Sequence, residues 1–171
     1  RKAAGWWASH GAQVQHEGTL AVALHRDQSD LTTFARRAPS AATLSKEQIA
    51  EQEPDLADRY SKALFLADEG HLDPRATLIA LHATLARRGV RFGGDIKGQV
   101  IDCRGLAARD SLTDLRGVKG EMLVVRCPDV SLSRPVRLLH PRFPLYIVPR
   151  GDRGFILGAT PSHSGERTRA T

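Results

Sequence analysis

The segment from Asp73 to Gly89 constrains the fold most strongly, because it carries the complete signature of one helix. Asp73 suits the capping position, Pro74 the first helical position, and Gly89 a left-handed cap at the C-terminal end. Three leucines repeat at helical spacing and form an apolar face: Leu78, Leu81 and Leu85. This helix therefore needs an apolar surface to pack against.

Buried strands are expected on both sides of this helix. The apolar run 63–67 precedes it, and residues 90–92 and 99–103 form two further apolar runs of strand length after it. A strand, a helix and a strand in succession are typical of an α/β unit. We therefore predict an α/β portion over about residues 63–110.

The N-terminal part of the chain contains two more helix signals. Residues 29–37 have helical spacing and stop close to a proline. Ser45 and Gln48 have the spacing of a capping box, and the helix that they begin must end before Pro54. Residues 14–24 are β-branched and aliphatic on either side of a Glu-Gly pair, which fits two short strands or one hairpin.

From Gly117 onward the pattern becomes one of short strands separated by turns. Four strands are predicted, at residues 119–126, 134–139, 145–149 and 155–159. A four-residue loop with glycine at each end, 151–154, fits a hairpin turn between the last two strands. We therefore predict the α/β (α+β) class, with a mostly antiparallel or mixed sheet flanked by helices.

The positive charge of the chain is concentrated in its second half. Residues 1–83 hold 9 basic and 11 acidic side chains, whereas residues 84–150 hold 13 and 6. These cations stand singly among apolar residues, so we rank nucleic-acid binding last among the possible functions. No apolar run approaches the ~20 residues of a membrane helix, and residues 1–11 lack the pattern of a secretory signal, so we expect a cytoplasmic protein with no membrane partner.

No motif in the sequence specifies a catalytic or metal-binding group. Cys103 and Cys127 have no neighbours at metal-ligand spacing and fit two small buried apolar side chains. The seven histidines include no pair at the spacing of a zinc site, and His82 fits a packed or boundary residue of the predicted helix. We therefore expect no metal site, and no catalytic side chain can be assigned.

Two segments have the features of a binding site. In residues 100–109 a buried strand runs into a small-residue turn, where backbone N–H groups can approach a phosphate; an ordinary strand-to-helix connection fits the same pattern. In the later strand, alternation places Tyr146, Val148 and Arg150 on one face. Tyr146 and Arg150 can hold a carboxylate there, although a tyrosine that covers the sheet beside an exposed arginine fits equally well.

These segments belong to a series of motifs that stand in the order of a known family. The motifs are Glu17–Leu20, Glu53–Leu56, Gly70–Pro74, Val100–Gly105, Arg116–Glu121, Arg134–Arg137, and Tyr146–Gly151 with Leu157–Thr160. From about Trp6 to Thr160 the chain thus resembles the flavin-dependent amine oxidases of the D-amino-acid oxidase superfamily. The resemblance is greatest to the glycine oxidases of the thiazole branch of thiamine biosynthesis.

The resemblance implies an enzyme in which FAD takes a hydride from the α-carbon of an amine, the imine hydrolyses, and O₂ reoxidises the flavin. Because the cofactor carries this chemistry, no catalytic side chain need be visible as a motif. By position, Tyr146 resembles the family's tyrosine that hydrogen-bonds the substrate carboxylate, and Arg150 is its predicted neighbour in substrate binding. Five residues are implied to contact FAD: Cys103, Arg104 and Gly105 near the pyrophosphate, and Gly120 and Glu121 near the flavin.

Parts of the family's pattern are absent from this sequence. It contains no G-x-G-x-x-G stretch to cradle the FAD diphosphate, and no later arginine in a Gly-Leu-Arg-Pro setting. We therefore expect a central fragment, with residues 1–160 as the substrate-binding domain with interleaved FAD-domain segments, and 161–171 as a polar, disordered tail. FAD is expected to bind weakly or not at all to this chain alone, and exposed apolar surface to favour a homo-oligomer.

Two functions of different classes are compatible with these features. The first is an FAD-dependent oxidoreductase that deaminates glycine or small D-amino acids to imine, ammonia and hydrogen peroxide and feeds thiazole synthesis. The alternative is a non-catalytic module, derived from the oxidase fold, that binds a small carboxylate or a partner chain.

Overall fold

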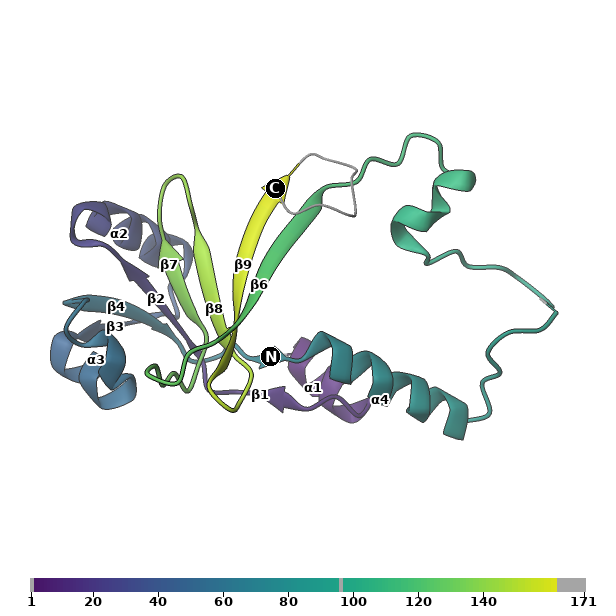
Figure 1. Cartoon of the computed structure of the whole chain (residues 1–171), viewed down its shortest axis with the longest axis horizontal. Coiled ribbons are helices and arrows are strands. Elements are labelled where there is room, and N and C mark those ends of the chain that lie inside the picture. Colours follow the sequence, from purple (N-terminus) through teal and green to yellow (C-terminus); the bar gives the residue numbers. More distant parts are fainter. Residues whose placement is uncertain (1, 96, 163–171) are drawn as a thin grey trace.

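The computed structural model describes residues 2–95 and 97–162, which form two sheets and four α-helices (Figure 1). The strands are β1 (Val14–Gln15), β2 (Thr19–Ala23), β3 (Ala42–Ser45), β4 (Lys62–Leu66), β5 (His71–Leu72), β6 (Lys119–Arg126), β7 (Val136–Leu139), β8 (Leu145–Pro149) and β9 (Gly154–Ser162). The α-helices are α1 (Lys2–Ser9), α2 (Gln28–Arg37), α3 (Lys46–Gln52) and α4 (Pro74–Arg87), and 3₁₀ turns span His25–Asp27, Pro54–Leu56 and Gly105–Asp110.

The larger sheet has seven strands in the order β3-β4-β2-β7-β8-β9-β6, and β1 pairs with β5 in a separate two-stranded sheet. All of these pairings are antiparallel except the parallel pairing of β2 with β7. The predicted α/β (α+β) class, with a mostly antiparallel sheet and flanking helices, is confirmed. Residues 14–24 form two strands of different sheets, so the single-hairpin alternative is wrong.

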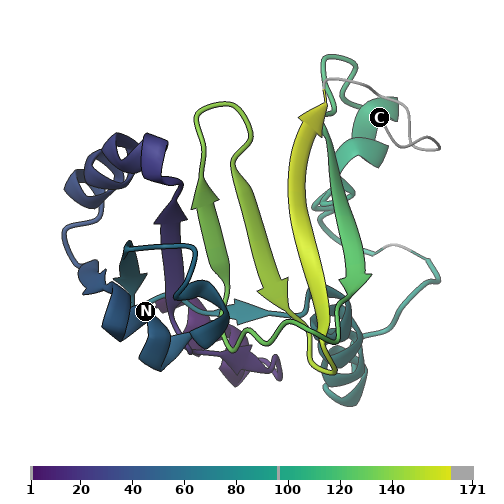
Figure 2. The same ribbon diagram turned by 60° about the vertical axis from the view of Figure 1, so that its left-hand side comes forward.

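The core lies at the β3-β4-β2 end of the sheet, where α2 and α3 cover opposite faces (Figure 2). All five residues of β2 are buried. Leu20 and Val22 pack with Ile49 of α3 on one face, while Ala21 packs with Leu31 of α2 on the other. Because β2 is enclosed on both faces, it anchors β7 and, through β7, the strands that follow.

Local signals in the sequence place α3 correctly. The Ser45 side chain accepts a hydrogen bond from the Gln48 N–H, and the Gln48 amide oxygen accepts one from the Ser45 N–H at 2.9 Å. The capping box is therefore confirmed, and the helix ends before Pro54 as predicted. The predicted helix over 29–37 is likewise present as α2.

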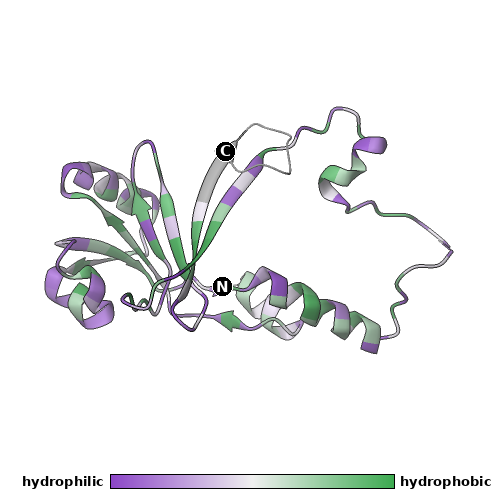
Figure 3. Cartoon of the chain, viewed as in Figure 1, coloured by the Kyte–Doolittle hydropathy of each residue, from purple (hydrophilic) through white to green (hydrophobic). Residues whose placement is uncertain are grey.

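Helix α4 has its predicted ends but not a buried apolar face. Asp73 accepts hydrogen bonds from the N–H groups of Arg75 and Ala76 at 2.8 and 3.0 Å, and Gly89 adopts the left-handed φ of 83°. Leu78 is nevertheless 65% exposed, and Thr77 is the one buried residue of the helix. Apolar stretches of α4 remain uncovered by the described residues (Figure 3).

Two predicted strands, 90–92 and 99–103, are wrong. Both lie in a long excursion between α4 and β6, whose described residues, 88–95 and 97–118, form no helix or strand apart from the 3₁₀ turn Gly105–Asp110 (Figure 1). Ile101 is 79% exposed, and Cys103 is exposed while Cys127 is half-buried, so the prediction of two buried cysteines fails at Cys103. A short apolar run becomes a strand only where a neighbouring edge satisfies its backbone, and none pairs with these runs in the described chain.

The four predicted strands of the C-terminal half are confirmed. The hairpin turn between β8 and β9 has left-handed φ angles of 46° at Asp152 and 55° at Arg153, and Gly154 donates to the Gly151 carbonyl at 2.7 Å. Strand β9 continues to Ser162, so it takes up the first two residues of the expected tail. The remaining tail residues, 163–171, lie outside the described residues.

Candidate functional site

A pocket of about 680 Å³ lies where β8, β9, β6, β5 and α1 meet, and we call it the Tyr146 pocket. Its walls include Tyr146, Val148 and Arg150 from β8 and its end, Met122 from β6, Ile156 from β9, Arg137 from β7, His71 and Leu72 from β5, and Trp7 from α1. The predicted grouping of Tyr146, Val148 and Arg150 is therefore present. These residues form one wall of a pocket whose lining combines apolar side chains with basic and hydroxyl groups and with the carboxylates of Asp68 and Glu69.

The position of the Tyr146 ring requires a glycine at the residue opposite it on β9. Tyr146 pairs across the sheet with Gly158, and a Cβ atom at Gly158 would lie 3.0 Å from the Tyr146 hydroxyl oxygen. The hydroxyl lies 3.4 Å from the sulfur of Met122, which is a weak acceptor. The hydroxyl thus keeps most of its hydrogen-bonding capacity for a ligand, and Gly158 is a site residue that the sequence alone did not indicate.

Arg150 is held by a histidine that sequence reasoning missed. Arg150 Nη1 lies 3.1 Å from His71 Nδ1. A guanidinium offers donors and no acceptor, so His71 Nδ1 must accept, which places the ring proton on Nε2. His71 Nε2 and Arg150 Nε are both buried and have no hydrogen-bond partner among the described residues.

The protonation state of His71 is determined by its surroundings. Burial lowers the pKa of His71, and the positive charge of Arg150 lowers it further, while Glu17 acts in the opposite direction. His71 is therefore neutral near pH 7, as its acceptor role requires. Arg137 is a second cation in the pocket wall, after Arg150. It lies 3.8 Å from the carboxylate of Glu69, which also lines the pocket.

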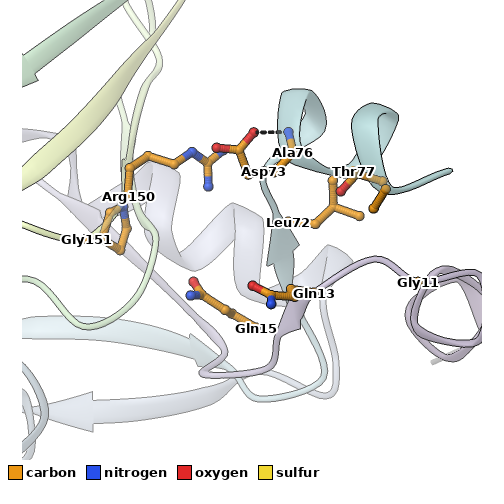
Figure 4. A pocket seen from close by; sticks show the side chains of 11 residues that line it. Gly11, Gln13, Gln15, Leu72, Asp73, Ala76, Thr77, Arg150 and Gly151 are labelled. Atoms are coloured by element: carbon orange, nitrogen blue, oxygen red, sulfur yellow. Dashed lines mark hydrogen bonds between the residues drawn. The ribbon is translucent and has the colours of Figure 1, made fainter. Parts of the chain in front are cut away.

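Arg150 also lines a second pocket of about 440 Å³, which we call the Gln13 pocket (Figure 4). Its polar walls come from Gln13 before β1 and Gln15 in β1, and from Asp73 and Thr77 at the start of α4. The Arg150 side chain extends toward Asp73 in this view. Hydrogen bonds from the Ala76 and Arg75 N–H groups, with burial opposing them, leave the pKa of Asp73 lowered, so its carboxylate is ionised at neutral pH.

The residues predicted near the FAD pyrophosphate lie elsewhere. Cys103, Arg104 and Gly105 stand on the excursion between α4 and β6 (Figure 1), and none of them lines the Tyr146 pocket. The Arg104 guanidinium is bound by two carboxylates, at 2.7 Å from Asp102 and 2.8 Å from Asp110. The Arg104 hydrogen bonds lower the pKa of Asp102 to about 2. In this arrangement the Arg104 guanidinium is paired with carboxylates, and the approach of Cys103, Arg104 and Gly105 to the FAD pyrophosphate stays a prediction.

The two residues predicted near the flavin stand on β6, beside Met122 of the Tyr146 pocket. A Cβ at Gly120 would meet no atom within 4 Å, so the strand is open to close approach there. Glu121 forms an ion pair with Lys119 at 2.7 Å. Their contact with FAD stays a prediction. No group of three or more potential metal ligands occurs among residues 2–95 and 97–162.

Comparison with known proteins fits this arrangement. A family described as FAD dependent oxidoreductase (DAO) matches residues 1–171. The chain belongs to this family. It is 48% identical over 168 residues to a Rhizobium etli protein provisionally named thiamine biosynthesis oxidoreductase ThiO, covering 94% of this chain and 51% of that protein. The resemblance read from the motifs is thereby confirmed, and FAD is the cofactor expected for the intact protein.

Solved structures share the fold at low sequence identity. A glycine oxidase from Bacillus cereus matches with a TM-score of 0.69 and 17% identity over 99% of this chain and 56% of its own. L-proline dehydrogenase from P. horikoshii matches with a TM-score of 0.69 and 14% identity over 97% of this chain and 55% of its own. The chain spans about half the length of these proteins. No helix in the described part of the chain is both long and apolar enough to cross a membrane.

Proposed function

We propose that this chain forms the substrate-binding part of an FAD-dependent oxidase that deaminates glycine or another small amino acid. Oxidation by O₂ gives the imine and hydrogen peroxide. The imine feeds thiazole synthesis, and imine that is instead hydrolysed gives the oxo acid and ammonia. The observation that carries the proposal is the convergence of Tyr146 and Arg150 on one pocket in a member of this oxidoreductase family. The name of the Rhizobium etli relative supports the assignment to thiamine biosynthesis.

The residues of the Tyr146 pocket divide into two roles. The Tyr146 hydroxyl and the Arg150 guanidinium bind the substrate carboxylate, because one donates a hydrogen bond and the other adds a charge-assisted one. Met122, Val148 and Ile156 form an apolar wall that excludes water from the α-carbon. These three side chains offer no polar group to a substrate side chain, which favours small substrates, whereas the charged groups Asp68, Glu69 and Arg137 lie elsewhere in the lining.

The family's cofactor fits one part of the chain better than another. When bound, FAD supplies the acceptor for the hydride that leaves the α-carbon. Gly120 and Glu121 are the residues that we propose to lie against it, because β6 is open at Gly120 and Met122 of the same strand lines the pocket. Cys103, Arg104 and Gly105 can approach the pyrophosphate only through their backbone N–H groups while Asp102 and Asp110 hold the Arg104 guanidinium, and this contact remains part of the proposal.

The decisive experiment uses the full-length gene product. Flavin absorbance and peroxide release are measured with glycine, sarcosine and D-alanine as substrates. Tyr146→Phe is expected to raise KM about tenfold with a smaller change in kcat, because the lost hydrogen bond to a charged group contributes roughly 1.5 kcal/mol to binding. A flavin-loaded protein that releases no peroxide with any of the three substrates contradicts the proposal.

The non-catalytic alternative is favoured by one observation, that Tyr146, Arg150 and Arg137 all come from this chain. A carboxylate site can therefore exist without the residues that hold FAD. Under this alternative the isolated chain binds glycine in calorimetry without flavin, and Tyr146→Phe weakens that binding. Peroxide release by the full-length protein decides for the oxidase.

A further inference from the structure

Arg150 occupies a position from which it can serve either of two pockets. Its backbone N–H is fixed by a hydrogen bond to the Gly154 carbonyl at 2.9 Å, but its long side chain lines both the Tyr146 pocket and the Gln13 pocket. An arginine side chain carries about 2 kcal/mol of rotamer entropy, so the backbone alone does not fix the guanidinium. A side-chain partner must therefore select its position.

The two candidate partners are His71 and Asp73, two residues apart on β5 and at the start of α4. Asp73 uses a carboxylate oxygen to cap α4 through Arg75 and Ala76. The positive charge of Arg150 helps to lower the pKa of Asp73, but no ion pair or hydrogen bond joins the two side chains among the described residues. His71 is the partner within hydrogen-bond distance, at 3.1 Å. The imidazole thus competes with an ionised carboxylate for the same guanidinium.

We propose that His71 is a positioning residue for carboxylate recognition, whose neutral Nδ1 holds Arg150 at the wall of the Tyr146 pocket and keeps the guanidinium from forming an ion pair with Asp73. The inference rests on the proposed function only in taking Arg150 as the group that binds the substrate carboxylate. It also accounts for the two unpaired donors. A carboxylate in the pocket provides acceptors for Arg150 Nε and His71 Nε2, which otherwise remain buried without partners.

The neutral state of His71 is essential to this role, because a protonated imidazole cannot accept from a guanidinium. Burial and Arg150 favour the neutral form. The other charged groups that face His71 or share its pocket are Glu17 before β2, Asp68 and Glu69 before β5, and Arg137 on β7. Protonation of His71 at a pH below the ordinary histidine pKa therefore removes the anchor of Arg150.

Three variants of the full-length protein test the role by direct binding of acetate and glycine in calorimetry. His71→Leu removes the acceptor and is expected to weaken acetate binding about tenfold, the loss of one hydrogen bond to a charged group. His71→Asn places an amide oxygen near the position of Nδ1 and is expected to restore the affinity to within about threefold. His82→Leu, at an exposed histidine outside both pockets, is the matched control and leaves the affinity unchanged.

Nitrogen NMR of His71 in the wild-type protein provides a measurement that does not depend on the folding of a variant. The inference expects the Nε2–H tautomer at pH 7.5. An Nδ1–H tautomer, unchanged acetate affinity in His71→Leu, or no acetate binding by the wild-type protein each overturns it. If acetate binds as expected while no substrate yields peroxide, the proposed oxidase function fails and the positioning role of His71 stands.

Discussion

The two ends of the seven-stranded sheet differ in how completely this chain covers them. At one end, α2 and α3 enclose β2, and all five residues of that strand are buried. At the other, β6 is an edge strand, and its residues Leu123 and Val124 are 66% and 76% exposed. Strands with apolar residues on both faces are typical of a buried position. We call these the packed end and the open end, and the Tyr146 pocket lies between them, on β8.

The largest expected effect comes from the buried carboxylate of the packed end. Glu53 is 1% exposed and accepts hydrogen bonds from the Ser133 N–H, the Ser133 hydroxyl and Arg134 Nε. Glu53→Ala leaves the Arg134 charge half-buried and unpaired, so we expect a loss of about 3–5 kcal/mol in the free energy of unfolding. Denaturant titration measures it, and Glu51→Ala, at an exposed position of α3 just before Glu53, should change the value by less than about 0.5 kcal/mol.

The same substitution at the two ends gives the most direct test of the comparison. Leu20→Ala opens a cavity beside a residue that is 0% exposed, so we expect a loss of about 2–5 kcal/mol. Leu123→Ala on β6 should change the free energy of unfolding of the isolated chain by less than about 0.5 kcal/mol. Equal losses at the two positions would show that the open end is covered in solution.

We propose that this chain forms a homo-oligomer, in which a second copy covers the open end of the sheet. Val124→Glu places a charge on the exposed apolar strand β6 and is expected to shift the isolated chain toward monomer in light scattering after size-exclusion chromatography. Thr32→Glu, on the exposed surface of α2, is the control. A monomeric wild-type chain contradicts the proposal.

Sequence reasoning succeeded where the determining interactions are local. The caps of α4 and the capping box of α3 join residues two or three positions apart, so their patterns are visible in the sequence. Alternation within β8 was likewise sufficient to place Tyr146 and Arg150 on one face. Each of these features depends on a few consecutive residues and on no distant surface.

It failed where partners distant in the sequence decide the outcome. The runs 90–92 and 99–103 are apolar, but no neighbouring strand of the described chain pairs with them. His71 reaches Arg150, 79 residues away, because β5 pairs with β1 beside the end of β8. Gly158 was missed for the same reason, since its role exists only opposite Tyr146. Such residues carry no local pattern.

Helix caps are expected to have smaller effects, and different ones at the two ends. Ser45→Ala removes the capping box of α3 at the packed end, so we expect a loss of about 1 kcal/mol in the free energy of unfolding. Asp73→Ala removes the equivalent cap of α4, which contributes the single buried residue Thr77. We expect this second change to lower helix content in circular dichroism with little change in the unfolding midpoint.

The smallest expected effect concerns the dependence of stability on pH, and it arises at the pocket between the two ends. The pKa of His71 is lowered in the folded protein by burial and by Arg150, whereas in the unfolded chain it returns to about 6.5. As pH falls through 6.5, the unfolded chain therefore takes up a proton that the folded chain does not, and the free energy of unfolding decreases. The contribution of this group is zero well above pH 6.5, so the loss begins only below neutral pH.

His71→Leu should show a shallower decrease than the wild-type protein between pH 7.5 and 5.5 in denaturant titrations, while His82→Leu keeps the wild-type slope. Identical slopes in all three proteins would mean that His71 is protonated equally in the folded and unfolded states. This result would contradict the role of neutral His71 as the hydrogen-bond acceptor for Arg150.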